Sequence, residues 1–460
     1  LDELNFADLE KNPTNIYEML RSGSRGKRTQ LKQIISAPVL VKDGKDRVVP
    51  NMITKSYAEG LDLGSYWTAL HGARKGTVQK VQGVSDPGYI SKQLVNSAIS
   101  QLVTTDDCGT TEGIVLSVDD PDVVDRFLAK DYKFGGRNTV FSPKTQSAAE
   151  KASVKSVLVR SPMRCEADHG VCKKCSGLTR SGNEMDIGTN FGVMAAQSIG
   201  EPSTQLSLNV FHTGGIAKGR GSDSVSKFKQ LSNLLRMPRE LQSVETAALA
   251  QLNGKVSSIR TAPQGGSFVS LSSGRSEKEH YVGANQALEV KKGQEVKKGE
   301  RLSSGFINSR DLLPLKGMSA VQDQISEDLY DVLKTVAPVR RRNIEVVVKS
   351  ATDSTLIEDP GDHPDWIRGD RRRISQVRAW NKKNKNKNAV AHSPELLGID
   401  VLPKMLQEDW IARLNYQDLS RSLAEAAQQG YRSNIHAFHP VPALAFAKEF
   451  GQSDGVMGVY

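Results

Sequence analysis

The stretch DIGTNFGVMAAQSIGEPSTQLSLNVFHTGGIAKGRG, residues 186–221, is the most informative part of this sequence. Its small residues at 192–199 predict one helix. GEP at 200–202 predicts the start of another helix, because proline is favoured in the first turn. The second helix should end at the GG pair, 214–215, since glycine is common just past a helix C-terminus. The stretch therefore predicts two successive helices followed by a glycine hinge.

The residues after the glycine pair predict the rest of a helical hairpin. IAKGRGSDSVSK (216–227) has no apolar period and is rich in Gly, Ser and Lys, which is typical of a mobile loop. FKQLSNLLRMP (228–238) resumes a helical pattern. His212 and Leu208 are one helical turn apart and face the same way, although a histidine at such a place is most often a plain surface side chain. The pattern predicts a tip that can fold and unfold.

The four cysteines of the chain give a second strong signal. Three lie in SPMRCEADHGVCKKCSG (161–177), and the fourth lies in TTDDCGT (104–110). A Cys-x2-Cys turn lets two thiolates bind one tetrahedral ion, and a set of four cysteine ligands leaves no open position for water or substrate. We therefore expect a closed, structural zinc site. Its ligands would be Cys108, Cys165, Cys172 and Cys175.

Two other interpretations account for the number and spacing of the cysteines less well. A redox pair of Cys172 and Cys175 would leave the other two cysteines without a role, and four unrelated buried thiols would leave their spacing unexplained. In a zinc site, Lys173 and Lys174 would partly offset the negative charge of the thiolates. The site would join the chain near residue 108 to the chain near residue 170, so it would act as a staple.

Length and composition bound the class of protein. A chain of 460 residues is too long for one compact core, so we expect several packed units. No apolar run is long enough to span a membrane, and the acidic start LDELNFADLEKNP is no secretory signal. Four cysteines are too few for a secreted disulfide framework. The net charge of +10 suits a polyanionic partner, and no membrane partner is expected.

Weaker patterns predict local structure elsewhere. Residues 38–53 alternate around the turn KDGKD and predict a hairpin. Residues 61–103 follow a long helical pattern that Gly83 and Pro87 should interrupt, because proline has no N–H to donate. The aspartates of VDDPD (118–122) are interpreted as helix caps rather than as a metal site.

Three basic segments allow more than one interpretation. SGSRGKRTQ (22–30) can present backbone N–H groups and Arg25 to phosphate, or it is a solvated loop. WIRGDRRRISQVRAWNKKNKNKN (366–388) is either a solvated insertion or a contact for nucleic-acid phosphate that its tryptophans anchor. RRRN (340–343) precedes a predicted strand, IEVVV (344–348), and is expected at the surface, either solvated or in contact with phosphate.

Taken in order, the motifs resemble a known family. SGSRGKRTQLKQI, HGARKG, DPGYISKQLV, TTDDCGT, RCEADHGVCKKC and AAQSIGEPSTQLSLNVFHTGG occur in the same order in β′, the largest catalytic subunit of multisubunit RNA polymerases. LNGKVSSI and LEVKKGQEVKKGERL are similar to its small β unit, where Gly293 and Gly299 would lie in successive turns. LKGMSAVQDQISEDLYDVLKTVAPVRRRNIEVVVKSA and LLGIDVLPKMLQEDWIARLNYQDLSRSLAEAAQQG are similar to its later segments. The chain thus resembles the C-terminal half of bacterial β′.

The resemblance implies a multi-segment α+β fold that is not an autonomous globular enzyme. In chain order it implies an N-terminal helix, basic loop and hairpin similar to the F-loop (1–60), a bridge helix (61–103), a zinc-binding module (104–185), a trigger loop with flanking helices (186–245), a small β unit (246–310), and a C-terminal clamp and helical region with a basic insertion at 366–388 (311–460).

The resemblance also implies where nucleic acid and nucleotide bind. The bridge helix would cross the active-site cleft behind the RNA–DNA hybrid. The expected nucleic-acid contacts are Arg74, Lys75, Tyr89, Lys92 and Arg25. The trigger loop would fold over an incoming NTP, and its contact positions are Gln205, Leu208, Asn209 and His212. His212 would contact the phosphates in a positional, electrostatic or proton-donor role, and the four cysteines would match the second zinc site of β′.

Three departures from the family pattern concern these sites. Leu208 stands where a methionine usually packs against the nucleobase. Asn209 replaces the usual arginine and so removes one cationic contact to the nucleotide. KVQGVSDP (80–87) replaces the usual Ala/Thr-rich run of the bridge helix.

The expected activity is that of a DNA-directed RNA polymerase, a nucleotidyltransferase, active only within a multisubunit complex. The sequence contains no carboxylate triad like NADFDGD, so this chain would hold no catalytic Mg²⁺ ligand, and a partner chain, the N-terminal half of β′, would hold the Mg²⁺. Other expected partners are β-like chains, a promoter-specificity factor, the DNA template, the RNA transcript and NTPs.

The start of the chain and its divergent segments favour one source. A start at Leu just before SGSRG suggests a split gene or a fragment, and the short trigger-loop tip and divergent bridge helix favour a giant bacteriophage. The protein would then lie in the cytoplasm of the infected bacterial host or in the virion.

A second function class stays open. The chain could be a non-catalytic, zinc-stapled nucleic-acid-binding protein that retains the fold. His212, the glycine hinge and GARKG (72–76) favour the polymerase, whereas Asn209 and KVQGVSDP (80–87) leave the second class open.

Overall fold

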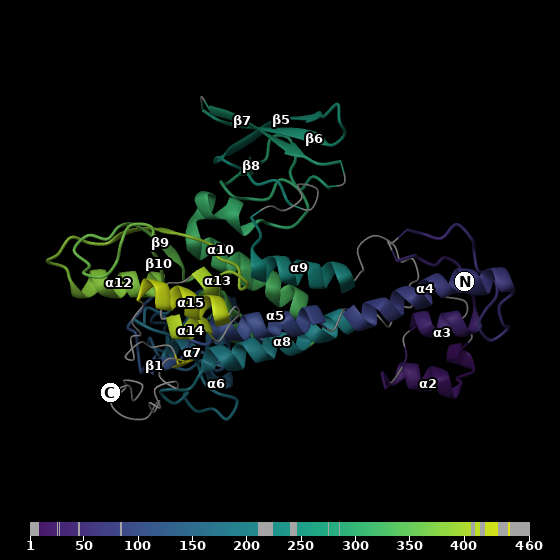
Figure 1. The fold of residues 1–460 in the computed structure, drawn as a ribbon, viewed down its shortest axis with the longest axis horizontal. Helices are drawn as coiled ribbons and strands as arrows, with labels where there is room; N and C mark the ends of the chain where they lie inside the picture. Colours follow the sequence, from purple (N-terminus) through teal and green to yellow (C-terminus); the bar gives the residue numbers. More distant parts are fainter. Residues whose placement is uncertain are drawn as a thin grey trace. The chain divides into compact units, whose positions relative to one another are not determined.

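The computed structural model describes most of the chain. The described residues are 9–24, 26, 28–44, 47–82, 85–209, 224–239, 246–274, 276–284, 286–405, 410–414, 419–430 and 440–441. The chain divides into two compact units, one made of Leu1–Ile90 with Gly200–Lys229 and the other of Ser91–Ile199 with Gln230–Tyr460. Helices and strands both occur, so the expected mixed α+β class is confirmed (Figure 1).

Two short helices open the first unit. α2 (Asn15–Arg21) begins where the Thr14 side chain accepts a hydrogen bond from the Tyr17 amide at 3.3 Å. α3 (Arg28–Ile35) contributes Leu31, which packs against Tyr17 in a small core. Antiparallel bridges then join Val39 to Ile53 and Lys42 to Val48, which confirms the predicted hairpin in a minimal form.

The predicted interruption of the long helical pattern at Gly83 lies outside the described residues. α4 (Leu63–Gln82) and α5 (Ser85–Ala98) are described on either side of residues 83 and 84. Pro87 lies in the first turn of α5, where a missing N–H costs no intrahelical hydrogen bond.

One predicted helix boundary is wrong. The sequence predicts a helix start at 200–202, but α8 (Phe191–Asn209) is continuous and contains Pro202. Proline removes a single hydrogen bond, to the carbonyl of Ser198 four residues earlier, and the good helix formers on both sides carry the helix through this position. α9 (Ser224–Arg236) is the next helix in the described part of the chain, and residues 216–223 of the predicted tip lie outside that part.

The buried helix α11 (Arg341–Thr352) lies at the centre of the second unit. The sequence predicts a strand at IEVVV and a surface position for RRRN, and both predictions are wrong. Every residue of α11 except Asn343 is buried, including Arg341 and Arg342. The β-branched residues Ile344 and Val346–Val348 have high strand propensity, and packing around the whole helix overrides that preference. α10 (Ser309–Leu333) packs beside it.

The ends of α5 and α8 pack close to α11 within this unit. The Ser350 hydroxyl donates to the Ser97 carbonyl at 2.5 Å. Gly192 is required at the first turn of α8, because a Cβ there would lie 1.9 Å from the Ala98 carbonyl oxygen. These contacts hold the three helices against one another.

Two small sheets lie later in the chain. β5 (Gly254–Thr261), β6 (Ser267–Ser273), β7 (Ser276–Val282) and β8 (Glu295–Val296) form an antiparallel sheet in the order β7-β6-β5-β8, drawn in teal in Figure 1. It has its own apolar core around Val256, Val269 and Leu271. Gly293 and Gly299 have φ of 87° and 78°, in the successive turns that the near-repeat predicts.

The basic segment 366–388 is folded. β9 (Thr355–Asp359), β10 (Arg371–Arg372) and β11 (Ala391–Pro394) form a sheet in the order β10-β9-β11, and α12 (Ile374–Lys383) packs with it. Trp366 and Trp380 pack against the buried side chains of this module, so the predicted anchoring role of the tryptophans is confirmed.

The remaining elements complete the chain. They are α6 (Pro143–Lys151), α13 (Leu402–Met405), α14 (Trp410–Leu414) and α15 (Leu419–Gln429). The short helix η1 (Pro121–Val123) begins at Asp120, whose carboxylate accepts from the Asp122 amide at 2.8 Å, so Asp120 is a helix cap as predicted. Within the described ranges, no helix has both the length and the apolar character that a membrane span needs.

Candidate metal centre

A pair of short parallel strands brings the two cysteine segments together. β1 (Val103–Thr105) pairs with β4 (Val171–Cys172), which places Thr105 opposite Cys172. Gly170, just before β4, has φ of 57°, and a Cβ there would lie 2.0 Å from the Leu102 carbonyl oxygen. Only glycine fits this approach, so the sequence HGVC permits the strand pairing that carries the site.

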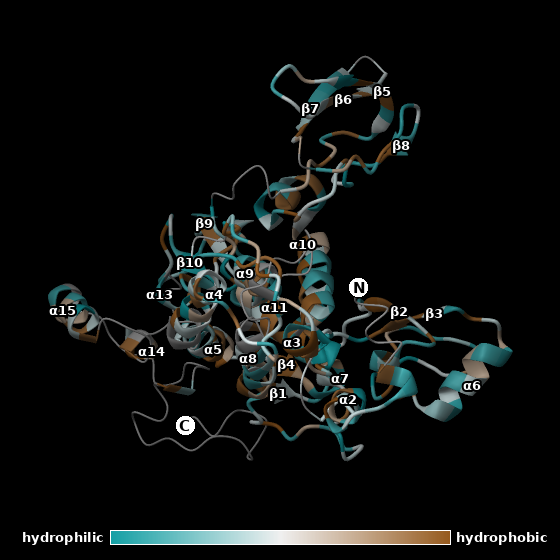
Figure 2. Cartoon of the chain, turned by 90° about the vertical axis from the view of Figure 1, so that its right-hand side faces the viewer, coloured by the Kyte–Doolittle hydropathy of each residue, from teal (hydrophilic) through white to brown (hydrophobic). Residues whose placement is uncertain are grey.

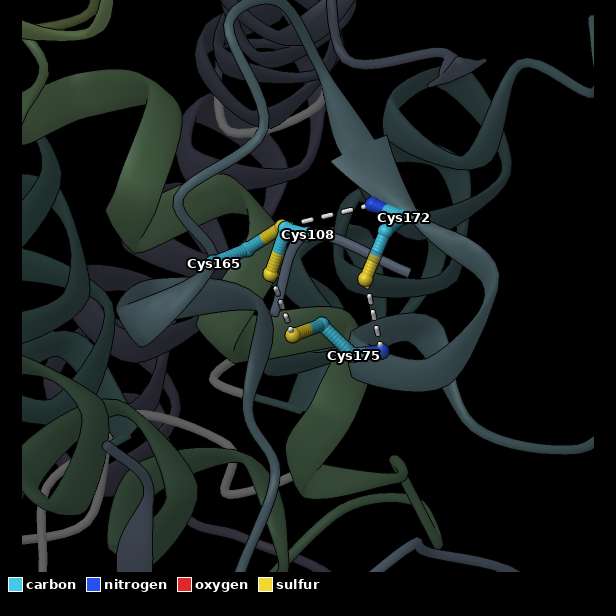
Figure 3. A group of neighbouring side chains, drawn as sticks. All are labelled: Cys108, Cys165, Cys172 and Cys175. Atoms are coloured by element: carbon cyan, nitrogen blue, oxygen red, sulfur yellow. Dashed lines mark hydrogen bonds between the residues drawn. The ribbon is translucent and has the colours of Figure 1, made fainter. Parts of the chain in front are cut away.

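Backbone amides orient the sulfurs of the second segment. Cys172 precedes the single-turn helix α7 (Lys173–Ser176), and its Sγ accepts a hydrogen bond from the Cys175 amide at 3.3 Å. Cys165 Sγ accepts from the Cys172 amide, also at 3.3 Å. Figure 3 shows both contacts and the convergence of the four side chains. These two hydrogen bonds orient the thiols of Cys165 and Cys172.

The four sulfurs form one compact cluster. The Sγ atoms of Cys108, Cys165, Cys172 and Cys175 all lie within 4.8 Å of one another, and those of Cys108 and Cys175 are 3.7 Å apart. A tetrahedral zinc ion about 2.3 Å from each sulfur would hold the sulfurs about 3.8 Å apart. All but Cys108 are buried. The geometry fits a metal ion, and the predicted grouping of the four cysteines is confirmed.

The thiols shift one another's pKa in opposite directions. Hydrogen bonds from the thiols of Cys165, Cys172 and Cys175 hold the pKa of Cys108 well below its usual range. Contacts with the other thiols, together with burial, raise the pKa of Cys172 and of Cys175. Four thiolates this close therefore require a cation among them, which is the charge that a bound metal supplies.

Arg160 is the closest cation to the cluster, and sequence reasoning missed it. Its side chain is fully buried. Its Nη2 lies within hydrogen-bonding distance of three sulfurs, those of Cys108 (3.1 Å), Cys175 (3.5 Å) and Cys172 (3.7 Å). Its Nη1 contacts Asn138 Oδ1 at 2.8 Å and Asp107 Oδ1 at 2.7 Å. The thiols around it raise the pKa of Arg160 against the effect of burial, so the guanidinium stays charged.

Lys349 is a second buried cation next to the cluster. It projects from α11, and its Nζ donates to the carbonyl oxygens of Cys165 at 3.2 Å and Gly170 at 2.7 Å. Burial raises the pKa of the Cys165 thiol, but hydrogen bonds from neighbouring thiols and the charge of Lys349 lower it to about 7. No sequence pattern points to this residue, because it is 184 positions from Cys165.

The lysines inside the CKKC turn have other partners. Lys173 Nζ pairs with Asp106 at 2.8 Å, and Lys174 pairs with Glu184. Lys174 also lies over the Phe127 ring. The expectation that these two lysines offset the thiolate charge is therefore corrected, because each is neutralised by a carboxylate.

Arg342 of α11 supports the backbone behind the cluster. Its Nη1 donates to the carbonyl oxygens of Leu178 at 2.9 Å, Ser176 at 3.1 Å and Asp125 at 3.2 Å. Gly177 lies between them with φ of 72°, and a Cβ there would be 2.1 Å from Nη1. Burial and the charges of Arg126 and Arg340 lower the pKa of Arg342 to about 10, so it remains a cation at neutral pH.

An apolar layer supports the module on another side. β2 (Ile114–Ser117) and β3 (Ser156–Val159) form an antiparallel pair, and both strands are brown in Figure 2. Their side chains share a core with Phe141 and Leu128, which are fully buried. The cysteine segments are thus held by a folded module and by α11.

The structure describes only part of the predicted nucleic-acid and nucleotide contacts. Arg74 is exposed and Lys75 half-buried on α4, and Tyr89 and Lys92 are exposed on α5. Gln205 is exposed on α8. Leu208 and Asn209 belong to α8, but their side chains, together with all of His212 and Arg25, lie outside the described residues. The nucleotide-contact predictions therefore stay predictions.

Comparison with known proteins identifies the family. The family described as RNA polymerase Rpb1, domain 5, matches residues 60–400, which include α4, the cysteine module and α11. This chain belongs to that family.

Individual relatives are bacterial. The protein from Moorella thermoacetica is 30% identical over 442 residues, which cover 90% of this chain and 37% of the relative. That from Clostridium acetobutylicum is 30% identical over 441 residues, covering 90% and 36%. That from Caldanaerobacter subterraneus is 29% identical over 448 residues, covering 92% and 37%. Each is named DNA-directed RNA polymerase subunit beta'. The chain spans a little over a third of their length.

Proposed function

We propose that this chain is part of a DNA-dependent RNA polymerase and corresponds to the C-terminal half of its β′ subunit. The carrying observation is the family match over residues 60–400, which runs from the predicted bridge helix through the cysteine module to the C-terminal helices. The named relatives are all beta' subunits of that enzyme. The reaction is the addition of NTPs to an RNA 3′ end on a DNA template.

In this proposal α4 and α5 are the bridge helix. Arg74 and Lys75 on α4, and Tyr89 and Lys92 on α5, face the template strand. Tyr89 and Lys92 are three residues apart, so they lie on one face of their helix. Cationic side chains at such positions bind phosphate, and an aromatic ring can stack on a base. Arg25, in the basic loop, makes a further phosphate contact.

The segment from α8 to α9 is the trigger loop. Closing elements of this kind align the triphosphate and exclude water, and phosphoryl transfer depends mainly on such positioning and on charge stabilisation. Gln205, Leu208 and Asn209 lie along the end of α8, where they would contact the nucleotide. His212 is four positions after Leu208 in the sequence and would contact the phosphates.

Two metal ions have different places in this proposal. The four cysteines hold structural zinc, for which the donor set and the sulfur spacing are suited. Catalytic Mg²⁺ is held by a partner chain with the N-terminal half of β′, and it stabilises the attacking and leaving oxygens. This chain contributes positioning groups to the reaction and no Mg²⁺ ligand.

The partner set follows from the same proposal. β-like chains complete the core, and a promoter-specificity factor, the DNA template, the RNA transcript and NTPs bind to the assembly. The divergent KVQGVSDP and the short tip between α8 and α9 support a giant bacteriophage as the source. The assembly would then work in the infected bacterial cell or be packaged in the virion.

Reconstitution tests the function. The chain is co-purified with its partner chains, the bound chains are identified, and elongation is measured on a primed RNA–DNA scaffold. His212→Ala should assemble normally and retain zinc but elongate at least about tenfold more slowly, because one phosphate contact of the closing element is lost. Unchanged elongation by His212→Ala contradicts the trigger-loop role. An assembled complex that binds nucleic acid but adds no nucleotide supports the non-catalytic alternative.

A further inference from the structure

A four-thiolate zinc centre carries negative charge that the surrounding protein has to compensate. One divalent ion and four thiolates carry two negative charges in excess, and burying uncompensated charge is costly. We propose that Arg160 and Lys349 are the two cations that balance this centre, and that they set its metal affinity and the donor strength of its thiolates. This inference rests on the proposed occupancy of the site by zinc.

Arg160 covers three of the four sulfurs. Its Nη2 reaches Cys108, Cys175 and Cys172 at 3.1 to 3.7 Å. The other end of the planar guanidinium is fixed by Asn138 and Asp107, so the Nη2 group is held toward the cluster. The Asp107 side chain is 31% exposed, whereas that of Arg160 has no exposure. The carboxylate thus pairs with Nη1, and Nη2 is the edge of the guanidinium that contacts the sulfurs.

Lys349 binds the backbone of Cys165, the ligand whose sulfur Arg160 does not contact. Its Nζ binds the carbonyl oxygens of Cys165 and Gly170 and is 5% exposed as a residue. Among the described residues it has no carboxylate partner. A buried ammonium group with no counter-charge is strongly unfavourable, and a negatively charged metal centre beside Cys165 supplies that counter-charge.

Other cations near the site are already paired. Lys173 and Lys174 bind Asp106 and Glu184. Arg164, next to Cys165 in the sequence, binds Gln322 at 2.6 Å and Asp323 at 2.7 Å. These side chains have partners that do not change when a metal binds, so they are matched controls for Arg160 and Lys349.

Metal affinity and the spectrum of the cobalt-substituted protein test the proposal in the full chain. Zinc affinity is measured by competition with a chromogenic chelator. Arg160→Gln and Lys349→Met should each raise the dissociation constant for zinc about 10- to 100-fold, the usual effect of removing an outer-shell partner. In the Co²⁺-substituted protein, loss of the N–H···S contacts in Arg160→Gln should move the sulfur-to-cobalt charge-transfer band to lower energy. Arg164→Gln and Lys174→Gln should stay within about twofold of the parent.

Each outcome separates this inference from the zinc proposal itself. If the parent chain binds no zinc, both fail together, and the parent measurement alone shows it. If the parent binds one equivalent but Arg160→Gln and Lys349→Met keep its affinity and its cobalt band, only the charge-balancing role is overturned. If Arg160→Gln is insoluble, Arg160→Met replaces it, because methionine removes both the charge and the N–H donors. A band shift in Arg160→Met supports the role of the guanidinium, and an unshifted band contradicts it.

Discussion

Arg126 and Glu345 form a bidentate ion pair in the interior of the second unit. Arg126 Nη1 donates to Glu345 Oε2 at 2.9 Å, and Nη2 donates to Oε1 at 2.6 Å. Neither side chain has any exposed surface. The Ser161 hydroxyl donates to the same carboxylate at 2.6 Å. The pair joins residues 219 positions apart, so it ties the cysteine module to α11.

Removing the charge of Glu345 should destabilise the fold strongly. Glu345→Gln leaves the Arg126 guanidinium buried without a counter-charge, and a buried pair broken on one side typically costs about 3–5 kcal/mol. Urea unfolding of the full chain measures the change. Glu425→Gln is the matched control, because its pair with Arg421 is exposed and should contribute less than about 1 kcal/mol. Equal, small losses of unfolding free energy in the two variants would contradict the large contribution expected from the buried pair.

The same pair should make stability depend on pH in the acid range. Burial by itself raises the pKa of Glu345, but the charge of Arg126 and hydrogen bonds from Arg126 and Ser161 bring that pKa below its ordinary value. A carboxyl whose pKa is lowered by folding stabilises the folded state above its unfolded pKa, and this stability is lost as the pH falls through the folded pKa. The difference in unfolding free energy between the parent and Glu345→Gln should therefore be largest near neutral pH and shrink below about pH 4. A difference that is constant from pH 7 to pH 3 contradicts this assignment.

The cysteine cluster could be predicted, because the spacing of the cysteines and the exclusion of other roles for them can both be judged from the sequence. Four cysteines in two short segments leave few alternatives, and glycine at 170 and 177 marks the tight backbone around them. The buried cations next to the cysteines could not be predicted. Arg160 and Lys349 reach the cluster from separate segments through tertiary packing, whereas the adjacent Lys173 and Lys174 bind carboxylates.

In both fold errors the wider structure overrides a local preference. The β-branched residues of α11 give it the composition of a strand, but packing around the whole segment stabilises a helix. Proline in α8 suggests a helix start by propensity, but a long helix tolerates the loss of one hydrogen bond. A local pattern does identify Asp120 as a helix cap, since a cap depends on neighbouring backbone groups.

Gly170→Ala should separate the two cysteine segments. The added Cβ would meet the Leu102 carbonyl carbon and oxygen, at 3.0 and 2.0 Å, at a φ that disfavours a side chain. Because that carbonyl accepts from the Val171 amide, the β1–β4 pairing should be lost and the zinc content should fall below about half an equivalent. Elemental analysis measures the zinc content. Gly182→Ala is the control, since its φ is also positive but no atom lies within 4 Å of the added Cβ. Full zinc content in Gly170→Ala would show that the close approach of residue 170 to the Leu102 carbonyl does not require glycine.

Removal of zinc should unfold the cysteine module and leave the four-stranded sheet intact. The pairing of β1 with β4 involves few residues, and without a metal the crowded sulfurs cannot all be thiolates, so the metal supplies much of the local stability. The sheet of β5 to β8 has an apolar core of its own around Val269 and Leu271, which contains no cysteine. Hydrogen exchange measured before and after chelation should show lost protection in β1 and β4 and unchanged protection in β6. Cys172→Ser should reproduce that pattern without chelator. Protection that survives in β1 and β4 in both experiments would mean that packing against α11 holds the module without a metal.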